Sequence, residues 1–346
     1  MKRFLALFLL ALAIGAFWAY SRVSTPYAGF QKPVLIEFAK GTSTRQMAAM
    51  LEKAGVVESA NWFLLARALR SGARLQAGEY EFTRPVSPLE IFDKIRRGDV
   101  HYYQVTIPEG SNVFDIARLV EAAGVGTAQE FLKEALGRTS FDLDPSAEGL
   151  EGYLFPASYR FTKGTTSRQL MQMMTARFRR AWSELNPGSA PVRRVVTLAS
   201  LIEEEAASPS DRPLIASVFQ NRLNRGMNLD CDPTVVYAAL LENKYRGTIY
   251  RSDLDRQSPY NTYRNSGLPP GPISNPGMES LKAALHPAET EFLFFVAKGD
   301  GSGTHIFSKT IAEHNKAVLE YRRGLQERKQ TGSAAPARRR TVAHAD

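Results

Sequence analysis

The strongest constraint on the fold is an apolar run that ends in three consecutive glutamates. Residues 192–207 contain neither glycine nor proline, and the stretch from Val195 to Ile202 is mostly apolar. Such a run predicts a helix that is buried over most of its surface. The fold must therefore accommodate the carboxylates of Glu203, Glu204 and Glu205 against its core.

A helical wheel separates the three glutamates. Glu203 falls in the apolar sector, Glu204 falls on the polar side, and Glu205 lies beside Arg194 but also near Leu198 and Leu201. Burial disfavours a charged carboxylate, so the pKa of Glu203 is predicted to rise toward the range of a general acid. The alternative interpretation is that the glutamates form a solvated helix end.

Length and charge restrict the class of protein. The chain of 346 residues is long enough for two domains with appendages, and its hydrophobic fraction of 44% is ordinary for a globular protein. The formal net charge is +9, and part of the excess lies at the chain ends. No basic stretch is interleaved with aromatic residues, so nucleic acid is not a predicted partner. An anionic polymer or a membrane surface accounts for the charge equally well.

The N-terminus predicts a membrane anchor. Lys2 and Arg3 precede an unbroken apolar run over 4–20 that closes with aromatic residues. A cleaved signal peptide is the alternative, but Ala11-Leu12-Ala13 lies inside the apolar run and is a poor cleavage site. The positive N-terminal charges place residues 1–3 in the cytoplasm and everything after Arg22 outside. Residues 21–32 are predicted to form a tether.

Two segments repeat each other after the tether. Residues 36–56 and 106–125 both predict a strand, a glycine turn, a Thr or Ser cap and an amphipathic helix. Residues 33–147 are therefore predicted to form a small α+β module that resembles LysM-like glycan-binding modules. The same turn-and-cap chemistry also occurs in folds that bind no ligand.

Residues 148–328 predict a second, mainly helical domain. Its loops at 258–263 and 267–277 are rich in proline and glycine, which fix an irregular backbone suited to a substrate site. Residues 292–297 and 304–307 predict a β-hairpin, and a final helix begins at Ile311. The polar tail of 329–346 is predicted to be disordered. The whole chain is thus assigned to the α+β class.

The sequence predicts neither a metal nor another cofactor. Cys231 is the single cysteine, and we interpret it as a small core residue. The five histidines lack the spacing of metal ligands, and no His-Glu-x-x-His motif occurs.

Several spaced motifs resemble the YceG-like endolytic murein transglycosylases (the MltG family). They are residues 199–205, 211–212, 216–223, 232–235, 260–263, 267–273, 275–277 and 286–287, with the linker motif at 150–156. The resemblance covers most of the chain from the anchor to about residue 322. It implies one membrane anchor, a LysM-like subdomain and a lysozyme-like catalytic domain outside the inner (plasma) membrane.

The resemblance also implies an activity. The family cleaves the β-1,4 bond between N-acetylmuramic acid and N-acetylglucosamine in peptidoglycan glycan strands, and it leaves a 1,6-anhydro end. The expected role is to limit the length of nascent strands, and peptidoglycan synthases are candidate partners. The first acid after the apolar run, Glu203, is the catalytic residue that the resemblance implies.

A single acid suffices for this chemistry. The glutamic acid protonates the glycosidic oxygen and then accepts the proton of the muramic acid 6-hydroxyl as the anhydro ring closes. Glu203→Gln is expected to reduce activity by roughly 10²–10⁴-fold. The candidate substrate-binding residues are Gln220, Asn221, Asp232, Tyr260, Asn261, Thr262 and Tyr263.

Three alternatives remain open from the residues alone. In the first, the loop at 258–263 has only a structural role. In the second, the protein is a muramidase that hydrolyses the same bond with water. As a third alternative, the protein is a non-catalytic glycan-binding scaffold at the division machinery.

Overall fold

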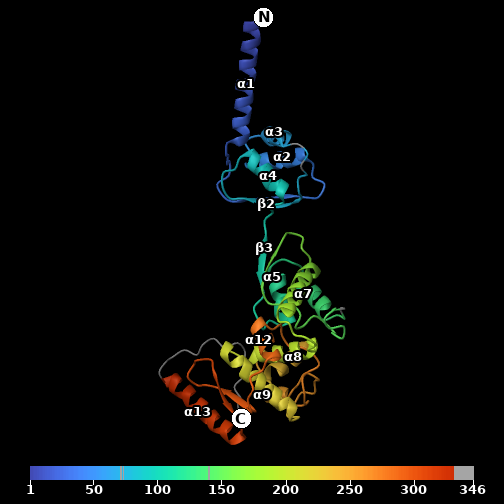
Figure 1. Cartoon of the computed structure of the whole chain (residues 1–346), viewed down its shortest axis with the longest axis vertical. Coiled ribbons are helices and arrows are strands. Elements are labelled where there is room, and N and C mark those ends of the chain that lie inside the picture. Colours follow the sequence, from blue (N-terminus) through green and yellow to red (C-terminus); the bar gives the residue numbers. More distant parts are fainter. Residues whose placement is uncertain (71, 73, 139–140, 331–346) are drawn as a thin grey trace. The chain divides into compact units, whose positions relative to one another are not determined.

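The computed structural model describes residues 1–70, 72, 74–138 and 141–330 (Figure 1). Contacts divide the chain into two compact units. Unit 1 comprises Met1–Tyr103 and Arg160–Thr165, and unit 2 comprises Gln104–Tyr159 and the residues from Thr166 on. The chain passes between the units at the paired strands β3 (Tyr103–Thr106) and β4 (Ser158–Phe161).

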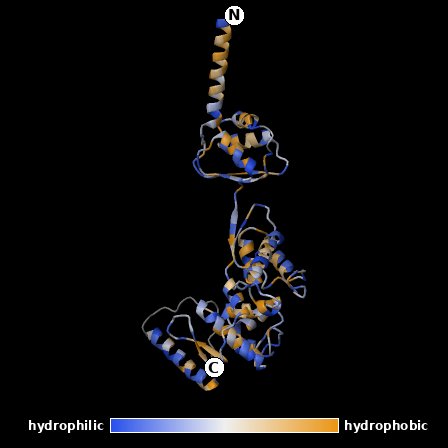
Figure 2. Ribbon diagram, in the orientation of Figure 1, coloured by the Kyte–Doolittle hydropathy of each residue, from blue (hydrophilic) through white to orange (hydrophobic). Residues whose placement is uncertain are grey.

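Unit 1 begins with a long apolar helix. Helix α1 (Lys2–Ser24) is exposed along almost its whole length, and Figure 2 shows its apolar colouring. Its mean hydropathy reaches 2.1, and among the described residues it is the one helix long and apolar enough to span a membrane.

The rest of unit 1 packs helices against a two-stranded sheet. Strands β1 (Val34–Phe38) and β2 (Gly78–Phe82) pair antiparallel, with Ile36 opposite Tyr80. The helices are α2 (Thr44–Lys53), α3 (Ala60–Leu69) and α4 (Pro88–Arg97). Capping boxes start α2 and α4, because Ser43 and Ser87 each exchange hydrogen bonds with the residue three positions later. The core contains the fully buried rings of Phe63, Tyr80 and Phe92.

Unit 2 is mainly helical. Its first helices are α5 (Val113–Ala122), α6 (Ala128–Ala135) and α7 (Ser167–Glu184), followed by α8 (Val192–Glu205), the short 3₁₀ helix η1 (Pro209–Asp211) and α9 (Arg212–Asn224). The remaining elements are α10 (Asp232–Leu241), α11 (Arg251–Leu254), α12 (Met278–Leu285), the hairpin of β5 (Phe294–Ala297) and β6 (His305–Ser308), and α13 (Ile311–Gln330).

Helix α8 lies at the centre of the unit 2 core. Every residue from Val195 to Glu203 is buried, as the apolar run predicts. The connector after α6 packs directly on this helix. Gly152 has φ +85°, and an added Cβ would lie 2.5 Å from Pro272 Cγ and 2.8 Å from Val196 Cγ1. A glycine is therefore required there both for the backbone conformation and for the close packing.

The predicted mixture of helices and strands is confirmed, as is the C-terminal hairpin, which forms one residue later at its second strand. Both repeated segments contain the expected strand and helix, β1 with α2 and β3 with α5. The contact boundary at Tyr103 falls inside the range 33–147 that the repeat assigned to one module, so the LysM-like module stays a prediction. Helix α13 begins at Ile311 as predicted and extends to Gln330. Nearly all of the predicted tail, 329–346, lies outside the described residues.

Candidate active site

Glu203 is fully engaged inside unit 2. Its side chain is 1% exposed. The Gly277 amide N–H and the Ser280 hydroxyl donate to Glu203 Oε2 at 3.1 and 2.8 Å. Arg212 Nη2 lies 3.4 Å from the other oxygen, Oε1. A residue from each of α8, α9 and α12 therefore meets at this carboxylate.

These contacts make Glu203 a tertiary cap of α12. The cap residue of α12 is Gly277, which has no side chain to accept the N–H groups of the first helical turn. The Glu203 carboxylate from α8 instead accepts the N–H of Gly277 itself and the Ser280 hydroxyl, at the end of the helix where negative charge is favourable. Both carboxylate oxygens of Glu203 therefore have donors from other helices. The geometry therefore suits Glu203 to holding α8 against α12.

Glu205 has a different environment, two residues further on. It is the last helical residue of α8 and is partly exposed. Desolvation by the surrounding side chains, and to a lesser extent the nearby Asp232 carboxylate, raise its pKa to about 7. The Cys231 thiol donates to Glu205 Oε1 at 3.3 Å and opposes this rise. That bond leaves Oε2 as the oxygen to carry the proton.

Asp232 and Tyr263 fix the charge beside Glu205. Asp232 is the first residue of α10, where the helix N-terminus favours a negative charge. The Tyr263 hydroxyl donates to Asp232 Oδ1 at 2.6 Å. Two neighbouring carboxyl groups resist double ionisation, so an Asp232 that is stabilised as an anion leaves the proton on Glu205.

The loop at 258–263 forms a rigid frame around this pair. Asn261 is completely buried, and its amide donates to Leu254 O and Arg256 O at 2.9 and 2.8 Å. Thr262 Oγ1 accepts the Cys231 N–H at 3.0 Å. Both side chains thus fix the backbone that presents Tyr263. This arrangement agrees with the structural interpretation of the loop for Asn261 and Thr262.

Tyr260 lies on the more exposed part of the same loop. Its ring packs 5.1 Å from that of Tyr237, and burial raises its pKa to about 12. Tyr237 in turn donates to Glu151, whose pKa burial raises to about 8. Asn275 Nδ2 donates to Glu151 Oε1 at 2.8 Å, so a buried polar network ties the connector to the loop before α12.

The two predicted binding residues of α9 differ in their contacts. Asn221 Nδ2 donates to Thr290 O and Phe292 O at 2.8 and 3.0 Å, which fixes the approach to β5. Gln220 is partly exposed, donates to Asn224 Oδ1 and accepts from Arg194. Asn221 is therefore part of the scaffold, and a substrate contact of Gln220 stays a prediction.

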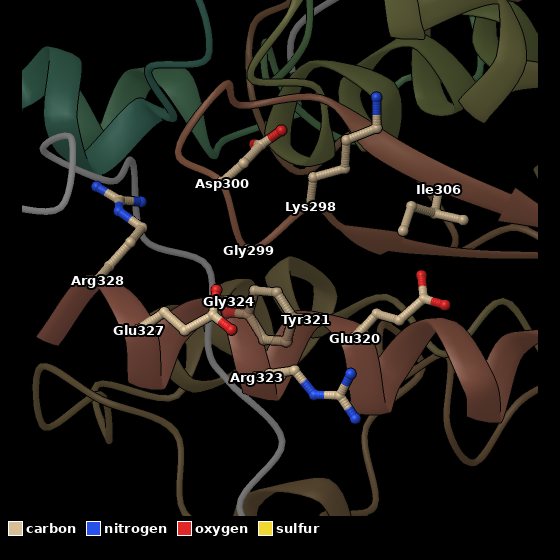
Figure 3. A pocket seen from close by; sticks show the side chains of 10 residues that line it. All are labelled: Lys298, Gly299, Asp300, Ile306, Glu320, Tyr321, Arg323, Gly324, Glu327 and Arg328. Carbon is tan, nitrogen blue, oxygen red and sulfur yellow. The ribbon is translucent and has the colours of Figure 1, made fainter. Parts of the chain in front are cut away.

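Unit 2 also contains hollows away from these carboxylates. One lies between the β5–β6 turn and α13, where Lys298, Asp300 and Tyr321 are among the lining residues (Figure 3). A second is lined by the loop after α10, including Lys244, Arg246 and Asp253. Neither is lined by Glu203 or Glu205, and the first mixes both charge signs along its length.

The structure thus assigns different surroundings to the three glutamates than the wheel alone suggested. The acid with the raised pKa and partial exposure is Glu205, which the sequence interpretation did not select. One signal was present, because Leu198 and Leu201 lie seven and four residues earlier on the same helix face. No group of three or more potential metal ligands occurs among the residues that the structure describes.

Comparison with known proteins places the chain among its relatives. A family model described as the YceG-like family matches residues 36–320. The chain belongs to the YceG-like family. This match covers both units and includes every residue of the glutamate site.

Two relatives of this chain carry the same name. A Bacillus subtilis (strain 168) protein named endolytic murein transglycosylase is 35% identical over 310 residues, covering 83% of this chain and 84% of the relative. A protein of the same name from Streptococcus pneumoniae D39 is 28% identical over 351 residues, covering 91% of this chain and 64% of the relative. The crystal structure of a YceG-like protein from Listeria monocytogenes aligns with a TM-score of 0.54 at 34% identity. The alignment covers 83% of this chain and 99% of the Listeria chain.

Proposed function

We propose that this YceG-like protein is an endolytic murein transglycosylase. It cleaves the β-1,4 bond between N-acetylmuramic acid and N-acetylglucosamine within glycan strands, without water, and leaves 1,6-anhydro ends. The name that its relatives share, endolytic murein transglycosylase, supports this reaction class. The partly exposed Glu205 carboxyl, whose pKa is raised to about 7, is the observation that carries the mechanism.

Glu205 acts as the general acid in the first step. Its Oε2–H protonates the glycosidic oxygen, and the bond from that oxygen to the anomeric carbon breaks with its electron pair left on the oxygen. The N-acetyl group of the muramic acid stabilises the positive charge that develops. A pKa near the working pH suits this transfer, because many Glu205 carboxyl groups are then protonated and each still gives up its proton readily.

The same carboxyl acts as the base in the second step. The muramic acid 6-hydroxyl attacks the anomeric carbon, and its proton returns to the Glu205 carboxylate. The ring closes as a 1,6-anhydro sugar, and the enzyme regains its starting protonation state. A pKa of about 7 serves both directions of transfer, which a normal glutamate pKa would not.

Asp232 and Glu203 are positioning residues in this proposal. The Asp232 carboxylate, fixed by the Tyr263 hydroxyl, keeps the proton on Glu205. Glu203 anchors the last turn of α8 to α12 and Arg212, and so fixes the direction in which Glu205 points. The sequence-based role of Glu203 as the acid is therefore transferred to Glu205 in our proposal. The position of Glu203 in the core supports this transfer.

The proposal extends to the membrane and to the remaining domains. Helix α1 spans the inner membrane with residues 1–3 in the cytoplasm, and both units lie on the outer side. Unit 1 with its β1–α2 repeat contributes a LysM-like glycan contact, and unit 2 supplies a lysozyme-like catalytic domain. Peptidoglycan synthases remain proposed partners.

Product mass tests the reaction. Purified glycan strands digested by the protein should release fragments that are one water lighter than those with a reducing end. Products that carry only reducing ends would refute the non-hydrolytic step. If the protein released no product from glycan strands of any length, that result would support the scaffold alternative instead.

One observation favours a hydrolytic muramidase as a second candidate. A second carboxylate, Asp232, lies close enough to Glu205 to raise its pKa, and hydrolytic glycosidases use a pair of carboxyl groups. Digestion in ¹⁸O-labelled water separates the two candidates. Incorporation of the label at the new ends indicates hydrolysis, and its absence together with anhydro ends indicates transglycosylation.

A further inference from the structure

Helix α3 of unit 1 carries an apolar stripe that faces away from the core. Phe63 and Ala66 are completely buried against the rest of the unit. Trp62, Leu65 and Leu69 lie within roughly 60° of one another at about 3.6 residues per turn, beside Ala66 and roughly 100–160° around the helix from Phe63. Trp62 and Leu65 are partly exposed, and Leu69 is 55% exposed.

Trp62 of this stripe contacts the C-terminal part of α1. The rings of Trp18 and Trp62 meet edge to face at 5.3 Å. Arg22 Nη1 lies 2.8 Å from Glu58 Oε2, just before α3. Val23 is completely buried, so the last turn of α1 is part of the unit 1 core. The C-terminal end of α1 therefore packs against the rest of unit 1.

This contact fixes the depth of α3 if α1 spans a bilayer. Trp18 lies about 24 Å along the axis from Lys2, at about 1.5 Å per residue. The hydrocarbon core is about 30 Å thick, so Trp18 falls near its outer boundary. Trp62, in contact with Trp18, must lie at a similar depth. Figure 1 shows α3 on the side of unit 1 next to α1, whereas β2 lies on the opposite side.

The charges near α3 fit a lipid surface. Arg67, Arg70 and Arg74 are exposed in and just after the C-terminal turn of the helix. Basic side chains close to an anionic bilayer are attracted to the lipid phosphate groups. An apolar stripe with flanking arginines is the composition of a helix that lies in the interface plane.

We infer that α3 is an interfacial membrane helix. Trp62, Leu65 and Leu69 enter the headgroup boundary of the leaflet that α1 leaves, and Arg70 and Arg74 after the last turn of α3 contact anionic lipid phosphates. The partner is the lipid surface itself. Unit 1 is thereby held against the bilayer in one orientation, with the β1–β2 face directed away from it.

Site-directed spin labels test this placement in the full-length protein. Leu69→Cys is labelled in vesicles of phosphatidylcholine and phosphatidylglycerol, and collision with lipid-soluble oxygen and with a water-soluble nickel chelate is measured. Leu35→Cys is the matched control, because Leu35 is a 48% exposed leucine on β1 of the same unit. The native Cys231 is buried with a raised pKa, and wild-type protein reports any background labelling.

The expected result is oxygen access several-fold higher at position 69 than at position 35, and nickel access several-fold lower. Leu10→Cys in the middle of α1 reports whether that helix spans the bilayer. Equal nickel access at positions 69 and 35 overturns the inference while leaving the spanning helix intact. Protection of position 69 from both reagents also overturns it, because that result indicates a protein partner or a second copy.

Discussion

Replacing Glu205 with glutamine should make the protein more stable at alkaline pH. The pKa of Glu205 is raised from the ordinary 4.5 to about 7. Below pH 4.5 the carboxyl is protonated in both folded and unfolded states, and its burial carries no ionic penalty. As the pH rises from 4.5 to about 7, the carboxyl ionises in the unfolded state but keeps its proton in the folded state, so stability falls. The loss is complete once the folded carboxyl also ionises above pH 7. Glutamine cannot ionise, so the variant escapes this loss.

The size of the effect follows from the two pKa values. Since a tenfold change in proton affinity is worth about 1.4 kcal/mol, the difference between 4.5 and about 7 corresponds to about 3 kcal/mol at most. Partial exposure of Glu205 lowers this figure, so we expect a gain of about 1–3 kcal/mol above pH 8. The melting temperature of unit 2 should rise by roughly 3–10 °C.

Denaturation at several pH values measures the gain. Wild type and Glu205→Gln are unfolded with guanidinium in detergent at pH 4.5, 6, 7 and 8.5, with Trp182 of α7 as the fluorescence probe for unit 2. The difference in free energy of unfolding should be near zero at pH 4.5 and grow as the pH rises. Parallel curves for wild type and Glu205→Gln at all four values would refute the reasoning.

Three further substitutions separate the roles of the neighbouring residues. Glu203→Gln should destabilise unit 2 by about 3 kcal/mol at neutral pH, because it disrupts a buried ion pair. In calorimetry the melting temperature should therefore fall for Glu203→Gln, whereas it should rise for Glu205→Gln. Tyr263→Phe removes the 2.6 Å hydrogen bond to Asp232, which stabilises that residue as an anion. The pKa of Glu205 should therefore fall, and the alkaline limb of the pH–rate profile should move to lower pH. An unchanged alkaline limb would contradict the claim that the Asp232 carboxylate raises the pKa of Glu205. Gly152→Ala should destabilise the fold by about 2 kcal/mol or more, since its Cβ meets a proline ring at 2.5 Å and its φ is +85°, and an unchanged denaturation midpoint would contradict the packing argument.

Local patterns in the sequence predicted most of the secondary structure. Capping residues such as Ser87 and Thr166 mark helix starts where the structure has them. Periodicity and turn residues likewise located the hairpin of β5 and β6. These features depend on neighbours along the chain, which a single sequence contains.

The role of each glutamate depended on neighbours from elsewhere in the chain. The wheel placed Glu203 in an apolar sector of its own helix, but its partners are Arg212 of α9 and Gly277 and Ser280 at α12. The environment of Glu205 likewise comes from residues 231 and 232, which follow α9. Burial of a helix face is readable from periodicity, whereas the polar groups that face it across the core are set by tertiary packing.

The division of the two repeats between units has the same origin. Residues 36–56 and 106–125 share a local pattern, which cannot specify the partners of each copy. Strand β1 pairs with β2 of unit 1, whereas α5 of the second copy packs on α6 of unit 2. Val113 at the start of α5 donates its N–H to Glu151, which ties the second copy to the connector.

The most direct test of the central claim compares Glu203 and Glu205 in one digestion assay. Initial rates of anhydro-end formation are measured by mass spectrometry for wild type, Glu205→Gln and Glu203→Gln, each shown by circular dichroism to be folded. We predict that Glu205→Gln loses at least roughly 10²-fold in rate while it stays folded and more stable above pH 7, and that folded Glu203→Gln retains more activity than Glu205→Gln. A wild-type rate in Glu205→Gln would contradict the account.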